Sequence, residues 1–132
     1  MSGYVTTPNL MAGGDIEPCR FIMLHTANDE TALQPTANAQ VYGVSWEGSY
    51  DAPGLPGAVT RAAYSGHPCP FFPIGSYCLL ELGASVTRGA ELASDSVGRG
   101  VTATTGQNVG GVAEQSGTIG QRIRLLVLSK AK

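Results

Sequence analysis

Apolar residues in this chain gather in short runs separated by Gly, Pro, Asn and Asp, and no run keeps a 3.6-residue period. Residues 19–25 and 76–82 are compact apolar runs bounded by turn residues, so each predicts a strand. In residues 122–128, Ile123, Leu125 and Val127 alternate with other residues, which predicts one buried face. Short strands with a turn signal every ten or so residues predict an all-β fold, a small antiparallel β-barrel or β-sandwich.

Two further stretches read as the same strand used twice. Residues 40–47 contain Val-Tyr-Gly-Val and residues 107–114 contain Val-Gly-Gly-Val, and each holds a Gly where another backbone is expected to come close. A gapless shift of 68 positions (109 − 41) aligns them. It also pairs Arg20 with Arg88, Leu24 with Leu92, Thr36 with Thr104, Gly43 with Gly111 and Val44 with Val112. The chain therefore either contains two copies of one β unit or shows coincidences common in Gly- and Thr-rich β proteins.

The connecting stretches predict an arm and a loop. Residues 1–18 carry scattered apolar side chains without a period, which favours an extended N-terminal arm that orders against a neighbouring subunit or partner, preceding a single β domain over residues 19–132. Residues 48–57 form a Pro- and Gly-rich loop. Residues 66–75 bring three prolines beside Phe71 and Phe72, so that segment cannot be a central strand.

Composition narrows the range of functions. The 132 residues carry only 14% charged side chains and a net charge of −2 without a basic or acidic block, so we expect no nucleic-acid or membrane partner. The N-terminus lacks the basic start and apolar core of a signal peptide, so we expect synthesis in the cytoplasm. Cys19, Cys69 and Cys78 are an odd number without a CxxC pair, which predicts buried, reduced thiols.

No motif predicts catalysis or a cofactor. His67 and Cys69, with His25, Cys19 and Cys78, have the residue types of a zinc site or of a Cys/His nucleophile pair, but neither reading has the required spacing. The acidic residues are dispersed. We therefore predict that the chain is not an enzyme and holds no metal or other cofactor.

Residues 75–127 resemble the head-decoration, or capsid cement, proteins of tailed bacteriophages and prophages. The resemblance rests on residues 86–92, Asp95, Gly98, residues 102–105, residues 109–114 and the closing strand. It implies a β domain in the virion that binds the outer surface of the assembled major capsid protein lattice, beside neighbouring copies of itself, and stabilises the phage head. The residues around 48–75 depart from this pattern, as does the longer N-terminal arm.

Apolar and aromatic side chains of the arm and loops are the candidate partner-binding residues: Tyr4, Val5, Leu10, Met11, Trp46, Tyr50, Phe71 and Phe72. Trp46 and Tyr50 have an equally plausible role in packing at the rim of the core. The alternative function is a non-catalytic β-sandwich binding module that recognises carbohydrate or peptide through the aromatic loop.

Overall fold

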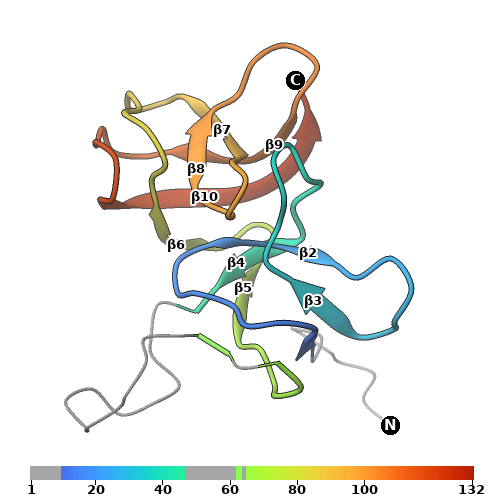
Figure 1. The fold of residues 1–132 in the computed structure, drawn as a ribbon. Helices are drawn as coiled ribbons and strands as arrows, with labels where there is room; N and C mark the ends of the chain where they lie inside the picture. Colours follow the sequence, from blue (N-terminus) through green and yellow to red (C-terminus); the bar gives the residue numbers. More distant parts are fainter. Residues whose placement is uncertain (1–9, 47–61, 64) are drawn as a thin grey trace, which may run out of the picture.

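The computed structural model describes residues 10–46, 62–63 and 65–132, and these residues form two five-stranded sheets without a helix (Figure 1). The predicted all-β class is confirmed. None of the described residues form a helix long and apolar enough to span a membrane. The first sheet has the order β1-β3-β2-β4-β5, and its strands are β1 (Met11–Ala12), β2 (Phe21–Leu24), β3 (Thr31–Leu33), β4 (Gly43–Ser45) and β5 (Phe71–Pro73). The second has the order β6-β10-β9-β7-β8, and its strands are β6 (Tyr77–Glu81), β7 (Glu91–Ser94), β8 (Gly100–Thr102), β9 (Asn108–Ala113) and β10 (Arg122–Ala131).

The strands predicted from apolar runs are confirmed with shorter bounds, and β10 extends to Ala131. Ile123, Leu125 and Val127 are buried as the alternation predicts. The sequence did not predict β1 or β3, whose two or three residues are too short for a periodic pattern. β5 forms within the Pro-rich segment, but as the last strand of its sheet, where Pro73 needs no donor on its outer side.

Each sheet curls until its edges meet. In the first sheet an antiparallel bridge joins Met11 of β1 to Pro68, shortly before β5. In the second sheet a parallel bridge joins Leu82, which follows β6, to Gly100 of β8, and Gly83 N donates to Gly100 O at 2.9 Å. Closure of this kind pairs edge strands that would otherwise be exposed.

Four strands of each sheet, β3-β2-β4-β5 and β8-β7-β9-β10, pair in the same order, which supports two copies of one β unit. Gly43, Val44 and Ser45 pair with Pro73, Phe72 and Phe71, just as Gly111, Val112 and Ala113 pair with Val127, Leu126 and Leu125. On the other side, Phe21 and Ile22 pair with Val44 and Gly43 as Glu91 and Leu92 pair with Val112 and Gly111. We name residues 10–73 the first repeat and residues 77–132 the second repeat.

This correspondence corrects part of the gapless alignment. The shift of 68 holds for Val41, Gly43, Val44 and Thr36, but the preceding strand needs a shift of 70, which matches Ile22 with Leu92 (92 − 22). Leu24 therefore corresponds to Ser94 and not to Leu92. Later in the repeats, the bridges Ile16 with Ala63 and Val86 with Gly117 are equivalent, so the sequence between Ser45 and Ala63 is longer than that between Ala113 and Gly117.

Backbone conformation supports the same correspondence. Four positions with positive φ recur in pairs: Cys19 with Gly89, Glu30 with Gly98, Asn38 with Gly106 and Gly66 with Gly120. The second repeat uses Gly at all four, whereas the first uses a side chain at three of them. The predicted close approach at the motif glycines is also confirmed, since a Cβ on Gly43 would lie 2.6 Å from Phe72 O and one on Gly111 2.8 Å from Leu126 O.

The repeats share one apolar cluster. Phe21, Val41 and Val44 of the first repeat lie with core residues of the second, including Leu80, Leu92 and Leu125. A Cβ on Gly110 would lie 2.6 Å from Val41 Cγ2 and 2.7 Å from Phe21 Cε1, so the absence of a side chain at Gly110 lets the first repeat approach β9. The two repeats therefore pack against each other through apolar side chains.

Polar contacts fix the register of this junction. Phe21 N donates to Gly98 O at 2.8 Å, and Glu81 N donates to Cys19 O at 2.8 Å. The Arg20 guanidinium donates to Glu81 Oε2 and to the Val97 carbonyl, both at 3.0 Å. The backbone before β2 thus adds to the second sheet.

The predicted arm falls into two parts. Residues 1–9 lie outside the described residues. Leu10, Ala12 and Ile16 belong to an apolar cluster with Ile22, Ala32, Ala62, Ala63 and Cys69, and β1 pairs with β3. The role of residues 1–18 as an arm stays a prediction, and a deletion that tests it without removing core residues is limited to residues 1–9.

Candidate docking surface

The structure places five of the eight predicted partner-binding residues, and they do not share one surface. Tyr4, Val5 and Tyr50 lie outside the described residues. Leu10 is buried at 5% exposure, whereas Met11 and Trp46 are 42% and 45% exposed. Phe71 and Phe72 are partly buried.

Phe71 and Phe72 point to opposite sides of β5, as neighbouring residues in a strand do. The Phe71 ring lies 5.7 Å from the Tyr42 ring and packs on the cluster that contains Leu10. The Phe72 side chain packs on the cluster shared by the two repeats. These two aromatic side chains therefore do not make a common flat platform for a ligand.

Phe72 borders an open hollow of about 640 Å³ that sequence reasoning did not predict. Its other lining residues are Tyr77, Cys78, Leu79, Glu114 and Arg124. Tyr77 is among the most exposed large apolar side chains. The alternation along β6 buries Cys78 and Leu80, and this pattern was the available signal that Tyr77 faces outward.

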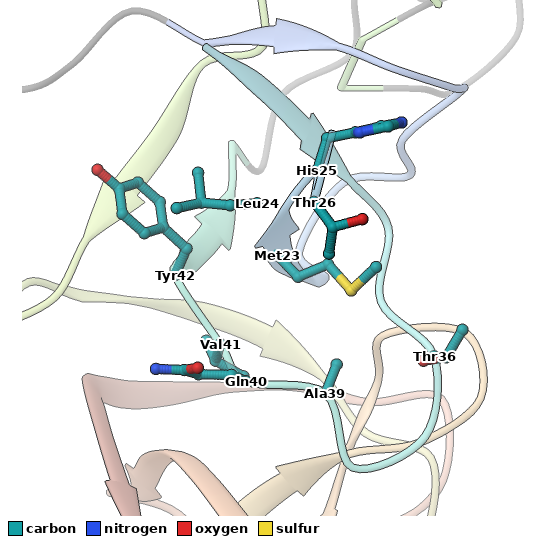
Figure 2. A pocket seen from close by; sticks show the side chains of 9 residues that line it. All are labelled: Met23, Leu24, His25, Thr26, Thr36, Ala39, Gln40, Val41 and Tyr42. Atoms are coloured by element: carbon teal, nitrogen blue, oxygen red, sulfur yellow. The ribbon is translucent and has the colours of Figure 1, made fainter. Parts of the chain in front are cut away.

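A second hollow, of about 450 Å³, lies in the first repeat between the end of β2 and the segment before β4 (Figure 2). We call it the β2 pocket, and it is lined by Met23, Leu24, His25, Thr26, Thr36, Ala39, Gln40, Val41 and Tyr42. Figure 2 shows the β2 residues on the upper side and residues 39–41 on the lower side. The lining includes no Asp, Glu, Lys or Arg side chain. Leu24 is 46% exposed.

The β2 pocket forms because two strands separate. Tyr42 N donates to Ile22 O at 2.9 Å, which is the last hydrogen bond recorded between them in the described part of the chain. Beyond it, His25 N donates to Thr31 O and the β2 strand follows β3 instead. The side chains of Met23 and Leu24 are thus left facing residues 39–42.

The ionisable groups do not assemble a catalytic site within the described residues. Burial raises the pKa of the Cys69 thiol to about 11, so this thiol is protonated at neutral pH and is a poor nucleophile. No group of three or more His, Cys, Asp or Glu side chains is arranged to hold a metal ion among those residues. All three cysteines are buried thiols outside any disulfide, as predicted.

Glu91 carries the other pKa shift. The Lys130 ammonium, through a hydrogen bond and its charge, and Lys132 at 3.6 Å lower the pKa of the Glu91 carboxyl against a smaller opposing effect of burial. These groups lie where the start of β7 meets the end of β10. The ion pairs join the end of β10 to the start of β7, and their residues line neither hollow.

Comparison with known proteins identifies a related fold. No protein-family model matches the sequence, and no curated protein matches it. Among solved structures, the chain is similar to the head fiber gp8.5 N base of bacteriophage phi29, known from a crystal structure, with a TM-score of 0.66 and 16% sequence identity. The similarity covers 94% of this chain and 95% of that chain. Both repeats, and not one alone, therefore take part in the shared fold.

Proposed function

We propose that this chain is a structural protein of a bacteriophage head, which binds the outer surface of the assembled major capsid protein lattice and stabilises it. The observation that carries the proposal is the similarity of fold to the phi29 head fiber base across nearly the whole of both chains. A resemblance of residues 75–127 to head-decoration proteins points to the same location, the virion. The two lines of support are of different kinds, since one uses the strand arrangement and the other uses residue types.

The surface suits attachment more than catalysis. The exposed large apolar side chains of the described residues are spread over both repeats: Met11, Leu24, Trp46, Ile74, Tyr77, Val97 and Ile119. Dispersed apolar contacts, each of modest strength, are sufficient for a protein that binds a symmetric shell in many copies. The low net charge of −2 also fits contact with protein better than contact with nucleic acid.

The N-terminal residues contribute to this attachment in our proposal. Residues 1–9 contain Tyr4 and Val5 and no charged side chain, a composition that suits an arm packed against another protein. We expect that deletion of residues 1–9 weakens binding to heads and leaves the melting temperature within about 2 °C of the full chain. Unfolding on deletion would contradict the assignment of these residues as an arm.

The proposal is tested by density-gradient fractionation of lysate from producing cells, with quantitative mass spectrometry of the particle band. We expect this chain to band with a major capsid protein at a constant ratio near whole numbers. A chain found wholly among soluble proteins at the top of the gradient would overturn the proposal. Saturable binding of a carbohydrate or peptide by that soluble chain would then support the alternative, a binding module.

A further inference from the structure

The β2 pocket has a counterpart in the second repeat, and that counterpart is filled. By strand register, Leu24 corresponds to Ser94 and Tyr42 to Gly110. Gln40 accordingly corresponds to Asn108. The turn at Asn38 of the first repeat sits between Ser94 and Asn108. Asn38 N donates to Ser94 O at 2.9 Å, and Asn108 donates to Asn38 through its backbone N (2.7 Å to Oδ1) and its side-chain Nδ2 (2.9 Å to the carbonyl).

The second repeat in turn carries a counterpart of the Asn38 turn. Thr104, Thr105 and Gly106 correspond to Thr36, Ala37 and Asn38, and the residues of both turns are exposed. The shapes agree, because Gly106 and Asn38 both have positive φ (90° and 57°). Gln107 N donates to Thr104 O as Ala39 N donates to Thr36 O, at 3.0 and 3.3 Å. The described residues thus include both the β2 pocket and a second turn of the kind that occupies its counterpart.

We propose that the β2 pocket binds the turn of residues 104–106 from a second copy of this chain, which joins copies head to tail. The contact repeats between chains a part of the junction that the structure already contains within one chain. It does not depend on the proposed attachment to a phage head. Because the pocket and the turn are different surfaces, the contact is heterologous and builds rings or linear arrays instead of a two-fold dimer.

The side chains around the pocket fit this occupant. Asn108 uses its side-chain amide to hold the backbone carbonyl of Asn38, and Gln40 keeps an amide that can donate to the carbonyl of Gly106 in the same way. Met23, Leu24 and Tyr42 offer an uncharged apolar wall, and the incoming turn has no charged side chain. The contact therefore buries no unpaired charge.

Three features make this contact smaller than the internal junction. In the second repeat, the Gly98 carbonyl accepts from Phe21 N, and Cys19 O accepts from Glu81 N beside it. In the first repeat, the equivalent carbonyl is that of Glu30, and it already accepts from Met11 N at 2.7 Å, so no further strand can pair there. Tyr42 occupies the place of Gly110 and excludes a counterpart of Phe21. Gly106 N is engaged by Lys132 O at 2.9 Å, so the turn offers its carbonyls and side chains only. We therefore expect weak association in solution that gains strength where copies are held side by side.

The test uses single-cysteine additions and a short bis-maleimide cross-linker at high protein concentration. Leu24→Cys places a thiol at the pocket, Thr105→Cys places one on the turn, and Ile119→Cys is the matched control on an exposed turn outside the contact. All three positions are exposed, and the three native cysteines are buried. Unchanged thermal melting of each variant confirms that it is folded.

The expected result is a cross-linked dimer from the mixture of Leu24→Cys and Thr105→Cys, in yield at least about tenfold above either variant alone. Mixtures with Ile119→Cys should give only the low yield of random collision. Similar yields from all pairs, or no product from the Leu24→Cys and Thr105→Cys pair, would overturn the proposal. Gln40→Cys, on the opposite wall of the pocket, should give a similar yield of cross-linked dimer with Thr105→Cys and is a second, independent measurement.

Discussion

Phe21 and Glu91 hold the same place in the two repeats, at the start of β2 and of β7, and their surroundings are opposite. Phe21 is fully buried against Gly110 at the junction. Glu91 is partly exposed and pairs with Lys130 and Lys132. The equivalent position therefore carries an apolar side chain where the other repeat covers it and a charged one where it lies partly exposed among the described residues.

The difference teaches that the two repeats are not interchangeable. The junction uses one surface of the first repeat and a different surface of the second, so each has changed where it meets the other. Phe21 and Gly110 are complementary, as are Arg20 and Glu81. The turns differ as well, because the second repeat has Gly at four positive-φ positions and the first keeps Cys19, Glu30 and Asn38 at three of them.

The largest expected effect comes from truncating the two equivalent residues. Phe21→Ala should destabilise the fold by about 4 kcal/mol, because it removes a fully buried aromatic ring and leaves a cavity between the repeats. Glu91→Ala should leave the denaturation midpoint nearly unchanged, since exposed ion pairs contribute little. Equilibrium urea denaturation of both variants measures this contrast, and equal losses would contradict the assignment of opposite environments.

The next effect tests the close approach at the junction. Gly110→Ala should cost about 2–3 kcal/mol, because the new Cβ would lie 2.6 Å from Val41 Cγ2 and 2.7 Å from Phe21 Cε1. Gly14→Ala is the matched control, since a Cβ there has no neighbour within 4 Å. Differential scanning calorimetry of the two variants should show a lowered melting temperature only for Gly110→Ala.

Substitutions at the two equivalent turns should change the stability of the fold in opposite directions. Gly98→Ala should cost about 2 kcal/mol, because φ is +84° and the Cβ would lie 3.0 Å from Pro35 Cδ. Glu30→Gly should stabilise by about 0.5 kcal/mol, because it relieves a positive φ of 55° in an exposed residue and the more flexible unfolded chain offsets part of the gain. Chemical denaturation checks both, and destabilisation by Glu30→Gly would contradict the equivalence of the turns.

The smallest expected effect is a dependence on pH. Since its folded-state pKa is lowered, Glu91 contributes stability at neutral pH that is lost as the pH falls through that lowered pKa. Carboxyl groups titrate between about pH 6 and about pH 3. Over this range the melting temperature of Glu91→Gln should therefore fall slightly less than that of the unsubstituted chain. An unchanged pH profile in this variant would show that the Lys130 and Lys132 pairs add nothing measurable.

Much of the fold follows from local sequence, and the rest depends on distant contacts. Apolar runs were enough for β2, β6 and β10, and the Val-x-Gly-Val motif located β4 and β9. The gapless comparison did not reveal the whole repeat. It allows neither for the two-residue offset before β3 nor for the additional sequence at residues 46–62. β1 and β3 owe their strand conformation to pairing with each other and with β2, and so carry no pattern of their own.

The candidate surface was less predictable than the fold. Sequence context left the role of Trp46 open, and the structure shows it 45% exposed. Leu10 supports the core, and Phe71 and Phe72 lie on opposite sides of one strand. The β2 pocket arises where β2 leaves β4 to follow β3, and that separation is set by hydrogen bonds between residues far apart in sequence. We infer a binding role for the β2 pocket only from its counterpart beside Ser94 and Asn108, where the Asn38 turn is bound.

The most direct test of the central claim is co-sedimentation of the purified chain with isolated phage heads that lack it, compared with unassembled capsid protein. The account predicts saturable binding to assembled heads at a fixed ratio to the major capsid protein, and much weaker binding to free subunits. Binding that does not saturate, or equal binding to assembled and unassembled protein, would contradict a role as a structural protein of the assembled head.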